Sequence, residues 1–205
     1  RGWRVLFLSL EMPAVQIRQR LLSGYSGIPL PNIIRADDPR MVKSATEMRS
    51  LPIWVEDGHG KTRLDIESIA AMVRVFKEMD PDRQAVVLVD YLQIVPTRLK
   101  YERRYELLGH VCRELKRCAL QNQVPMIVAA QLSRAAEQRG KDARPQLSDL
   151  RESGEIEQVA DQVLLVHRLP DKTILGLAKY RNGPTFVAEA KFVGEECRFE
   201  DFSRF

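Results

Sequence analysis

Five short segments of the chain are apolar almost throughout their length. Most of them do not alternate apolar with polar positions, and this continuous pattern is typical of strands in a parallel sheet whose two faces are both covered. The intervals between the segments are long enough for a helix or a long loop. We therefore predict strands at residues 4–10, 52–57, 85–90, 124–131 and 161–167.

Helical spacing occurs in two of these intervals. Apolar residues recur every three or four positions across 66–76 and again across 107–119. Pro13 suits the first turn of a further helix that runs to about Ser23. The pattern predicts an α/β domain with a mostly parallel sheet. An antiparallel extension is expected from three extended segments with short turns between them, at 173–180, 185–192 and 197–202.

Composition narrows the class of protein. The chain has 205 residues, 44% hydrophobic and 29% charged, which is enough apolar material for one domain with a substantial core. No apolar run approaches the ~18 residues of a membrane-spanning helix, so we expect no membrane contact. The three cysteines form no C-x-x-C pair, which favours a cytoplasmic protein without disulfides or zinc. The net charge of +4 favours a polyanionic partner only weakly.

Three predicted strands end on a polar residue that apolar packing does not explain: Glu11, Asp90 and Gln131. Because ligands of open parallel sheets bind at the carboxyl ends of the strands, these side chains would meet at one ligand site. A carboxylate on a buried strand can hold the water shell of Mg²⁺, a second can polarise an attacking water, and an amide can hydrogen-bond a γ-phosphate. The alternative for each residue alone is a helix cap or a solvated strand end.

The sequence KYRNGP at 179–184 places two cations where a turn begins. Asn-Gly and Gly-Pro are turn signals, so a hairpin loop with a solvated tip is one interpretation. Side chains alternate along an extended segment, so Lys179 and Arg181 would project to the same side. The second interpretation is that both cations reach one anionic group.

Five motifs, LFLSLEMP, LVDYLQIV, IVAAQLSR, DLRESGEIEQVAD and KYRNGP, resemble the RecA-like motor domain of DnaB-type replicative helicases in order and spacing. The resemblance covers nearly the whole chain. It implies a RecA-like P-loop NTPase core, with a mostly parallel sheet covered by helices on both faces and an antiparallel C-terminal extension. It also implies an ATP-dependent homo-hexamer that unwinds duplex DNA by moving 5′ to 3′ along single-stranded DNA. ATP and Mg²⁺ would be its cofactors, with a primase and a helicase loader as partners.

The resemblance also implies roles for single residues. Glu11 resembles the carboxylate that activates water for ATP hydrolysis, and Asp90 resembles the Walker B aspartate that acts on Mg²⁺. Gln131 resembles the glutamine that couples the γ-phosphate to the DNA-binding loops. Lys179 and Arg181 resemble the pair of cations that reaches the ATP held by a neighbouring subunit, where a guanidinium stabilises charge on the transferred phosphoryl group.

The RESG turn of the longest motif resembles the family's contact with the backbone of single-stranded DNA. Arg151, Glu152 and Gly154 match it, and a glycine lets the chain approach a phosphate closely. The same segment also has the pattern of a helix start with Ser153 as N-cap, and both interpretations can hold because a helix N-terminus is an anion site. Further candidates for DNA contact, with a solvated basic loop as the alternative, are Arg134, Arg139, Lys141, Arg144, Arg98, Lys100, Arg103 and Arg104.

The sequence departs from the family at the phosphate-binding loop, G-x-x-x-x-G-K-[ST]. This sequence contains one Gly-Lys-Thr, at Gly60-Lys61-Thr62, and Val55 stands where the motif requires its first glycine. We expect the loop and the start of a helix there instead. We therefore expect residues 1–205 to be a RecA-like motor domain truncated at its N-terminus, with the phosphate-binding strand and helix encoded upstream.

Two other functions stay open at this point. One is an assembly or DNA-binding module without a P-loop, which would oligomerise or bind DNA without ATP turnover. The other is a RecA- or RadA-type recombination ATPase with the same fold. DLRESGEIEQ and KYRNGP resemble the replicative helicases more closely than the recombination enzymes, so we expect the helicase.

Overall fold

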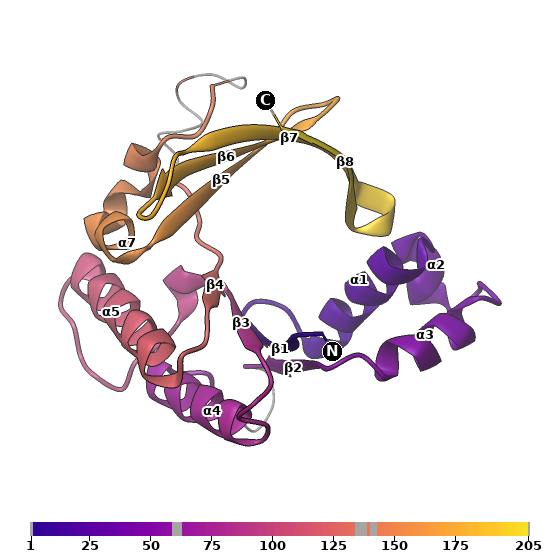
Figure 1. The fold of residues 1–205 in the computed structure, drawn as a ribbon, viewed down its shortest axis with the longest axis horizontal. Helices are drawn as coiled ribbons and strands as arrows, with labels where there is room; N and C mark the ends of the chain where they lie inside the picture. Colours follow the sequence, from indigo (N-terminus) through magenta and orange to yellow (C-terminus); the bar gives the residue numbers. More distant parts are fainter. Residues whose placement is uncertain (1, 59–62, 134–138, 140–142, 205) are drawn as a thin grey trace.

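The computed structural model describes residues 2–58, 63–133, 139 and 143–204, without the side chains of 151–153 and 201–204. A parallel sheet with flanking helices lies beneath a second, antiparallel sheet that arches over it (Figure 1). The strand order of the parallel sheet is β2-β1-β3-β4. Its members are β1 (Arg4–Ser9), β2 (Ile53–Asp57), β3 (Ala85–Asp90) and β4 (Met126–Val128).

The main core lies between this sheet and two helices, α4 (Ile66–Glu78) and α5 (Arg104–Asn122). The three-four spacing predicted both helices, and it places their apolar stripes against the strands. Every second side chain of β1 and β3 is buried against these helices. The fully buried members include Leu8, Ile66, Ile69, Val73, Val87, Val89, Leu108 and Val111.

Charged side chains hold both ends of α4. Asp65 caps the N-terminus by accepting from the Ser68 N–H at 2.8 Å, and Arg98 pairs with the same carboxylate at 3.0 Å. Burial would raise the pKa of Asp65, but the hydrogen bonds from Arg98 and Ser68 outweigh it and keep the pKa below its usual value. Arg4, buried on β1, donates to the Phe76 carbonyl at 2.7 Å, where the helix dipole favours a cation.

A smaller cluster packs three helices beside β2. They are α1 (Ala14–Ser26), α2 (Leu30–Arg35) and α3 (Met41–Arg49), joined through buried Leu22, Ile28 and Ile33. The helix predicted from Pro13 is thus confirmed, with Gly27 in the left-handed conformation ending it at φ 66°.

The second sheet has the order β5-β6-β7-β8 and is antiparallel throughout. Before it come two short helices, η2 (Leu147–Ser153) and α7 (Gly154–Val159). Its strands are β5 (Gln162–Arg168), β6 (Thr173–Tyr180), β7 (Phe186–Val193) and β8 (Arg198–Arg204), with η3 (Gly194–Glu196) before the last. The predicted antiparallel extension is confirmed.

Two predicted strands differ from the structure in detail. The segment at 161–167 was expected beside the parallel strands, but β5 pairs antiparallel with β6, because the short turn closed by the Leu169–Lys172 hydrogen bond joins only antiparallel neighbours. The segment at 124–131 forms only the three-residue β4. Its partner β3 ends at Asp90 and turns into the 3-10 helix η1 (Leu92–Ile94), so the ladder stops there.

Candidate nucleotide site at the carboxyl edge of the sheet

The carboxyl ends of three neighbouring strands line up in register. Ser9, the last residue of β1, pairs with Asp57 on β2 and with Asp90 on β3. The next residue, Leu10, donates its N–H to the Asp90 carbonyl at 2.8 Å. Asp90 therefore ends a strand at the ligand-binding edge, as the sequence predicts, and Glu11 lies in the turn that begins beside it.

The turn that carries Glu11 is held by two side chains that sequence reasoning did not select. The buried Ser9 hydroxyl donates to the Met12 carbonyl at 2.7 Å and accepts from the Met12 N–H at 3.2 Å. The Asp57 carboxylate accepts from the Ala14 N–H at 2.5 Å and so caps α1. The Glu11 side chain itself is exposed at this edge. Asp57 ends its strand as Asp90 does, so the same strand-end rule would have found it.

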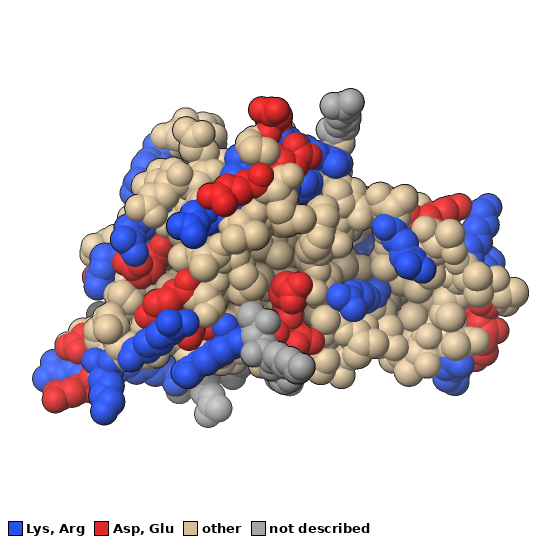
Figure 2. All heavy atoms as spheres, turned by 90° about the horizontal axis from the view of Figure 1, so that it is seen from below, with Lys and Arg blue, Asp and Glu red and all other residues tan. Residues whose placement is uncertain are grey.

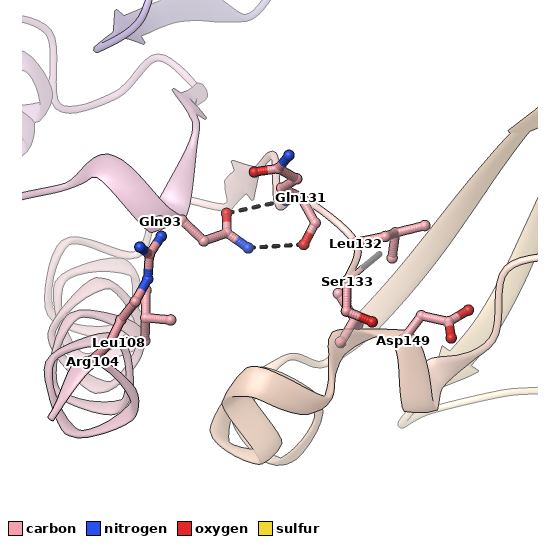
Figure 3. Close-up of a pocket in the computed structure, with 8 residues that line it drawn as sticks. Gln93, Arg104, Leu108, Gln131, Leu132, Ser133 and Asp149 are labelled. Atoms are coloured by element: carbon pink, nitrogen blue, oxygen red, sulfur yellow. Dashed lines mark hydrogen bonds between the residues drawn. The ribbon is translucent and has the colours of Figure 1, made fainter. Parts of the chain in front are cut away.

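Gln131 lies at the same edge, in the loop that follows β4. Ala129 extends the contact through two hydrogen bonds of 2.9 Å, one to Val89 of β3 and one from Leu92 of η1. Gln131 then bonds through its backbone to the side chain of Gln93 in η1. The side-chain amide of Gln131 is exposed and takes no part in these bonds (Figure 3). The fold thus brings the end of β3 at Asp90 and the loops that carry Glu11 and Gln131 to one edge, as predicted.

A small cavity lies behind this loop, between η1, the N-terminal end of α5 and η2 (Figure 3). Its volume is about 50 Å³, far below the roughly 300 Å³ at which ligand pockets begin. The nucleotide therefore does not fit inside it. Residues from four segments line it: Gln93, Arg104, Leu108, Gln131, Leu132, Ser133, Asp149 and Leu150.

Lys179 and Arg181 reach the same end of α7, which confirms that they share a side. The Lys179 ammonium donates to the Glu157 carbonyl, and the Arg181 guanidinium donates to the Gln158 carbonyl at 3.1 Å. Arg181 also pairs with Asp161 at 3.1 Å. Free carbonyls at a helix C-terminus attract cations, so the chain itself orients both side chains.

Asp161 is shared between Arg181 and Lys116 of α5. The hydrogen bond from Lys116 is the main cause that keeps the pKa of Asp161 below its usual value. Lys116 and Arg181 also line an open groove of about 500 Å³ that is formed mainly by α5. Its other lining residues are Arg113, Arg117, Leu120, Gln121 and Val159. Sequence reasoning did not select Asp161, although it closes the longest motif.

The DNA candidates are placed only in part. Gly154 begins α7, and a side chain there would meet nothing within 4 Å, so its surroundings are open. Arg151 and Glu152 lie in η2, but their side chains are outside the described part of the chain, as is that of Ser153. Arg134 and the Gly60-Lys61-Thr62 segment lie outside the described residues altogether.

Two basic candidates have structural partners instead. Arg98 pairs with the cap of α4, and Arg139 pairs with buried Asp149. Figure 2 shows Lys and Arg interspersed with Asp and Glu over the face that it presents, without one continuous basic patch. Within the described ranges, no three His, Cys, Asp or Glu side chains are grouped to hold a metal ion. None of the described helices is long and apolar enough to cross a membrane.

Comparison with known proteins adds a family match over most of this chain. Residues 1–201 match the model of the DnaB-like helicase C-terminal domain. The chain is 34% identical to the replicative DNA helicase DnaB of Leifsonia xyli, over 97% of this chain and 45% of that protein. It is 36% identical to the replicative DNA helicase DnaC of Bacillus subtilis, over 96% of this chain and 47% of that protein. The chain therefore spans about half the length of these relatives.

Two solved structures share the fold. One is described as an ATPase domain and superposes with a TM-score of 0.88 at 29% identity, over 96% of this chain and 74% of that one. The other, a DnaB-like replicative helicase solved to describe its interactions with primase, gives 0.86 at 28% identity, over 96% and 50%. Both likenesses agree with the parallel sheet and its antiparallel extension.

Proposed function

The chain belongs to the family of DnaB-like helicase C-terminal domains, and from this premise we propose that it is the motor domain of an ATP-dependent replicative DNA helicase. The observation that carries the proposal is the convergence at one sheet edge. Ser9 and Asp90 end neighbouring strands in register, and the turn of Glu11 and the loop of Gln131 flank them. The family match favours a replicative helicase over a recombination ATPase.

Each residue of the edge has a role suited to its position. Asp90, fixed by a buried strand, would hold the water shell of Mg²⁺, and that ion would neutralise charge on the phosphates of bound ATP. Exposed Glu11 would orient and polarise the attacking water. The Gln131 amide would hydrogen-bond the γ-phosphate. A single carboxylate suffices here, because Mg²⁺ keeps most of its waters and binds the substrate's phosphates.

The second half of the site would come from a neighbouring subunit. Lys179 and Arg181 point to one side, next to the groove on α5. We assign them to the ATP of the next subunit in a homo-hexamer, where such cations are worth roughly 10³–10⁵ in rate. A heterologous interface of this kind forms a ring when the rotation between successive subunits closes.

The phosphate-binding strand and helix would lie outside the sequence given. In the described residues, the outer edges of β4 and β5 pair with no strand. Large apolar side chains are exposed along them: Ile127 at 60%, Leu164 at 52% and Val166 at 51%. Unpaired edges with exposed apolar residues invite a further strand. The coding sequence upstream of Arg1 tests this, since it should encode G-x-x-x-x-G-K-[ST] within roughly 20–40 residues.

The remaining assignments follow from the family and from one solved relative. We propose cytoplasmic action on single-stranded DNA in the 5′ to 3′ direction, with Arg151, Glu152, Gly154 and Arg134 at the DNA backbone. Such binding is mostly electrostatic, so affinity should fall steeply as salt rises. A primase partner is proposed because a DnaB-like relative is described with one. A helicase loader is expected on the same family grounds.

The full-length protein that contains this chain tests the proposal directly. We expect ATP hydrolysis stimulated by single-stranded DNA, unwinding of a forked duplex, and loss of both in Asp90→Asn. Asp82→Asn is the matched control, because Asp82 is an exposed carboxylate in the turn before β3. This variant should leave both activities intact. A ring that binds DNA and nucleotide but never hydrolyses ATP would instead identify a non-catalytic assembly module.

A further inference from the structure

The side chain of Gln93 forms two hydrogen bonds with the backbone of one residue, Gln131. Its Nε2 donates to the Gln131 carbonyl at 2.9 Å, and its Oε1 accepts from the Gln131 N–H at 3.1 Å. The two residues are 38 positions apart. Figure 3 shows both bonds across the gap between η1 and the loop. The amide therefore satisfies both polar backbone groups of Gln131.

The contact between Gln93 and Gln131 follows the point where the β3–β4 ladder ends. The β3–β4 pairing stops at Val89 and Val128, and the bonds of Ala129 are the last between main chains. Because η1 has already turned away, the described part of β3 offers Gln131 no strand partner. Two residues opposite each other in an antiparallel pair exchange both an N–H and a C=O bond. The Gln93 amide supplies the same pair of bonds from a side chain.

Fixing both backbone groups also fixes the side chain. The N–H and C=O of an extended residue lie in one plane, and its Cβ stands out of that plane. Rotation of residue 131 about the chain axis would break at least one bond to Gln93. The exposed Gln131 amide is therefore held in the direction that Figure 3 shows, outside the two bonds to Gln93.

The loop is held at its other end as well. The Ser133 N–H donates to the Asp149 carbonyl at 2.9 Å, and buried Asp149 is bonded to Gln146 at 2.7 Å and to Arg139. Residues 131–133 thus connect η1, which begins two residues after Asp90, to η2. Of these ties, only Gln93 acts on the residue assigned to the γ-phosphate.

We propose that Gln93 is a positioning residue that aims the Gln131 side chain at the γ-phosphate. The inference rests on the proposed function. Loosening a group by about 1 Å can cost up to roughly 10²-fold in rate, and only one of several constraints on the loop is lost in Gln93→Ala. We therefore expect a roughly tenfold fall in kcat with little change in KM.

A double-mutant cycle in the full-length protein separates aiming from simple support of the fold. Single-turnover ATP hydrolysis is measured for the wild type, Gln93→Ala, Gln131→Ala and the double variant. If Gln93 acts through the Gln131 side chain, its loss matters only while that side chain is present. The expected further loss in the Gln131→Ala background is less than about twofold. An equal fold-loss in both backgrounds, or an unchanged kcat in Gln93→Ala, overturns the inference.

Hydrogen exchange at the Gln131 amide gives a readout that does not depend on activity. It should become faster in Gln93→Ala, because the acceptor is removed. Gln84→Ala is the matched control, since Gln84 is exposed at the opposite end of β3. In this control variant, exchange at the Gln131 amide should not change. Unaltered exchange in Gln93→Ala would show that the tie is not formed in solution and would overturn the inference. A wild-type protein without ATPase overturns the proposed function, and this inference falls with it.

Discussion

Arg181 and Asp161 are joined twice. The guanidinium lies 3.1 Å from the carboxylate, and the Arg181 N–H donates to the Asp161 carbonyl at 2.9 Å. Lys116 of α5 contacts the other carboxylate oxygen. One acidic residue at the start of β5 thus orients the cation that we assign to a neighbour's ATP, and it does so from within the same chain.

Asp161→Asn should therefore lower ATP turnover while leaving nucleotide binding intact. The asparagine keeps the size of the side chain and the backbone bond but removes the charge that holds Arg181. Loosening this cation is expected to reduce kcat roughly tenfold, measured in a steady-state ATPase assay. Asp171→Asn, exposed in the turn between β5 and β6, is the control. Equal turnover in the two variants would count against the positioning role of Asp161.

Asp57→Ala should affect both stability and turnover. The variant removes the carboxylate that accepts from the Ala14 N–H and caps α1. Loss of a cap typically costs about 1 kcal/mol of unfolding free energy. The turn carrying Glu11 would also loosen, so kcat should fall by more than the fraction of folded protein explains. Asp37→Ala, an exposed residue after α2, should change neither quantity measurably.

Asp149→Asn should give a stability difference that depends on pH. Burial raises the pKa of Asp149, but hydrogen bonds from Gln146 and Arg139 outweigh it and keep the pKa below its usual value. The stabilisation is therefore present above the usual pKa and is lost as pH falls through the depressed value. We expect the wild type to be about 1–2 kcal/mol more stable at pH 7 and at pH 5. Below about pH 3.8 the difference should shrink, and a difference that grew there would contradict this assignment.

In the folded protein, Cys112 should react slowly with alkylating reagents. It lies buried in α5, and burial raises the pKa of its thiol to about 11. Since the thiolate is the reactive form, very little reacts at pH 8. Cys197, which is partly exposed, should be modified first when the folded protein is treated with iodoacetamide and analysed by mass spectrometry. Equal alkylation rates of Cys112 and Cys197 in the folded state would show that α5 does not pack as described.

The sequence pattern predicted most of the elements that position the site. Continuous apolar runs located β1, β2 and β3, and the strand-end rule located Asp90 and the loops of Glu11 and Gln131. The sheet that each strand joins was not predictable in the same way. The apolar run of β5 fits either sheet, and only the short turn before β6 decides between them.

Contacts between distant side chains and backbone groups were also missed. Nothing in the local sequence indicates that Gln93 bonds to Gln131, since 38 residues separate them. Ser9 was predicted only as a member of its strand, and Asp161 only as the first residue of the strand predicted at 161–167. Each acts through tertiary geometry that neither periodicity nor propensity encodes. Family resemblance carries such roles only for residues that the family motif already identifies.

Mixed rings test the central claim, that Lys179 and Arg181 act on the ATP of the neighbouring subunit. Full-length Arg181→Ala and Glu11→Ala proteins should each bind nucleotide but not hydrolyse it. In a random one-to-one mixture, about a quarter of the interfaces combine an intact Glu11 with an intact Arg181 from the next subunit. We predict that ATPase activity returns in the mixture to a clear fraction of the wild-type rate. If mixed rings demonstrably form and hydrolysis stays absent, the assignment of these cations to a neighbour's ATP is wrong.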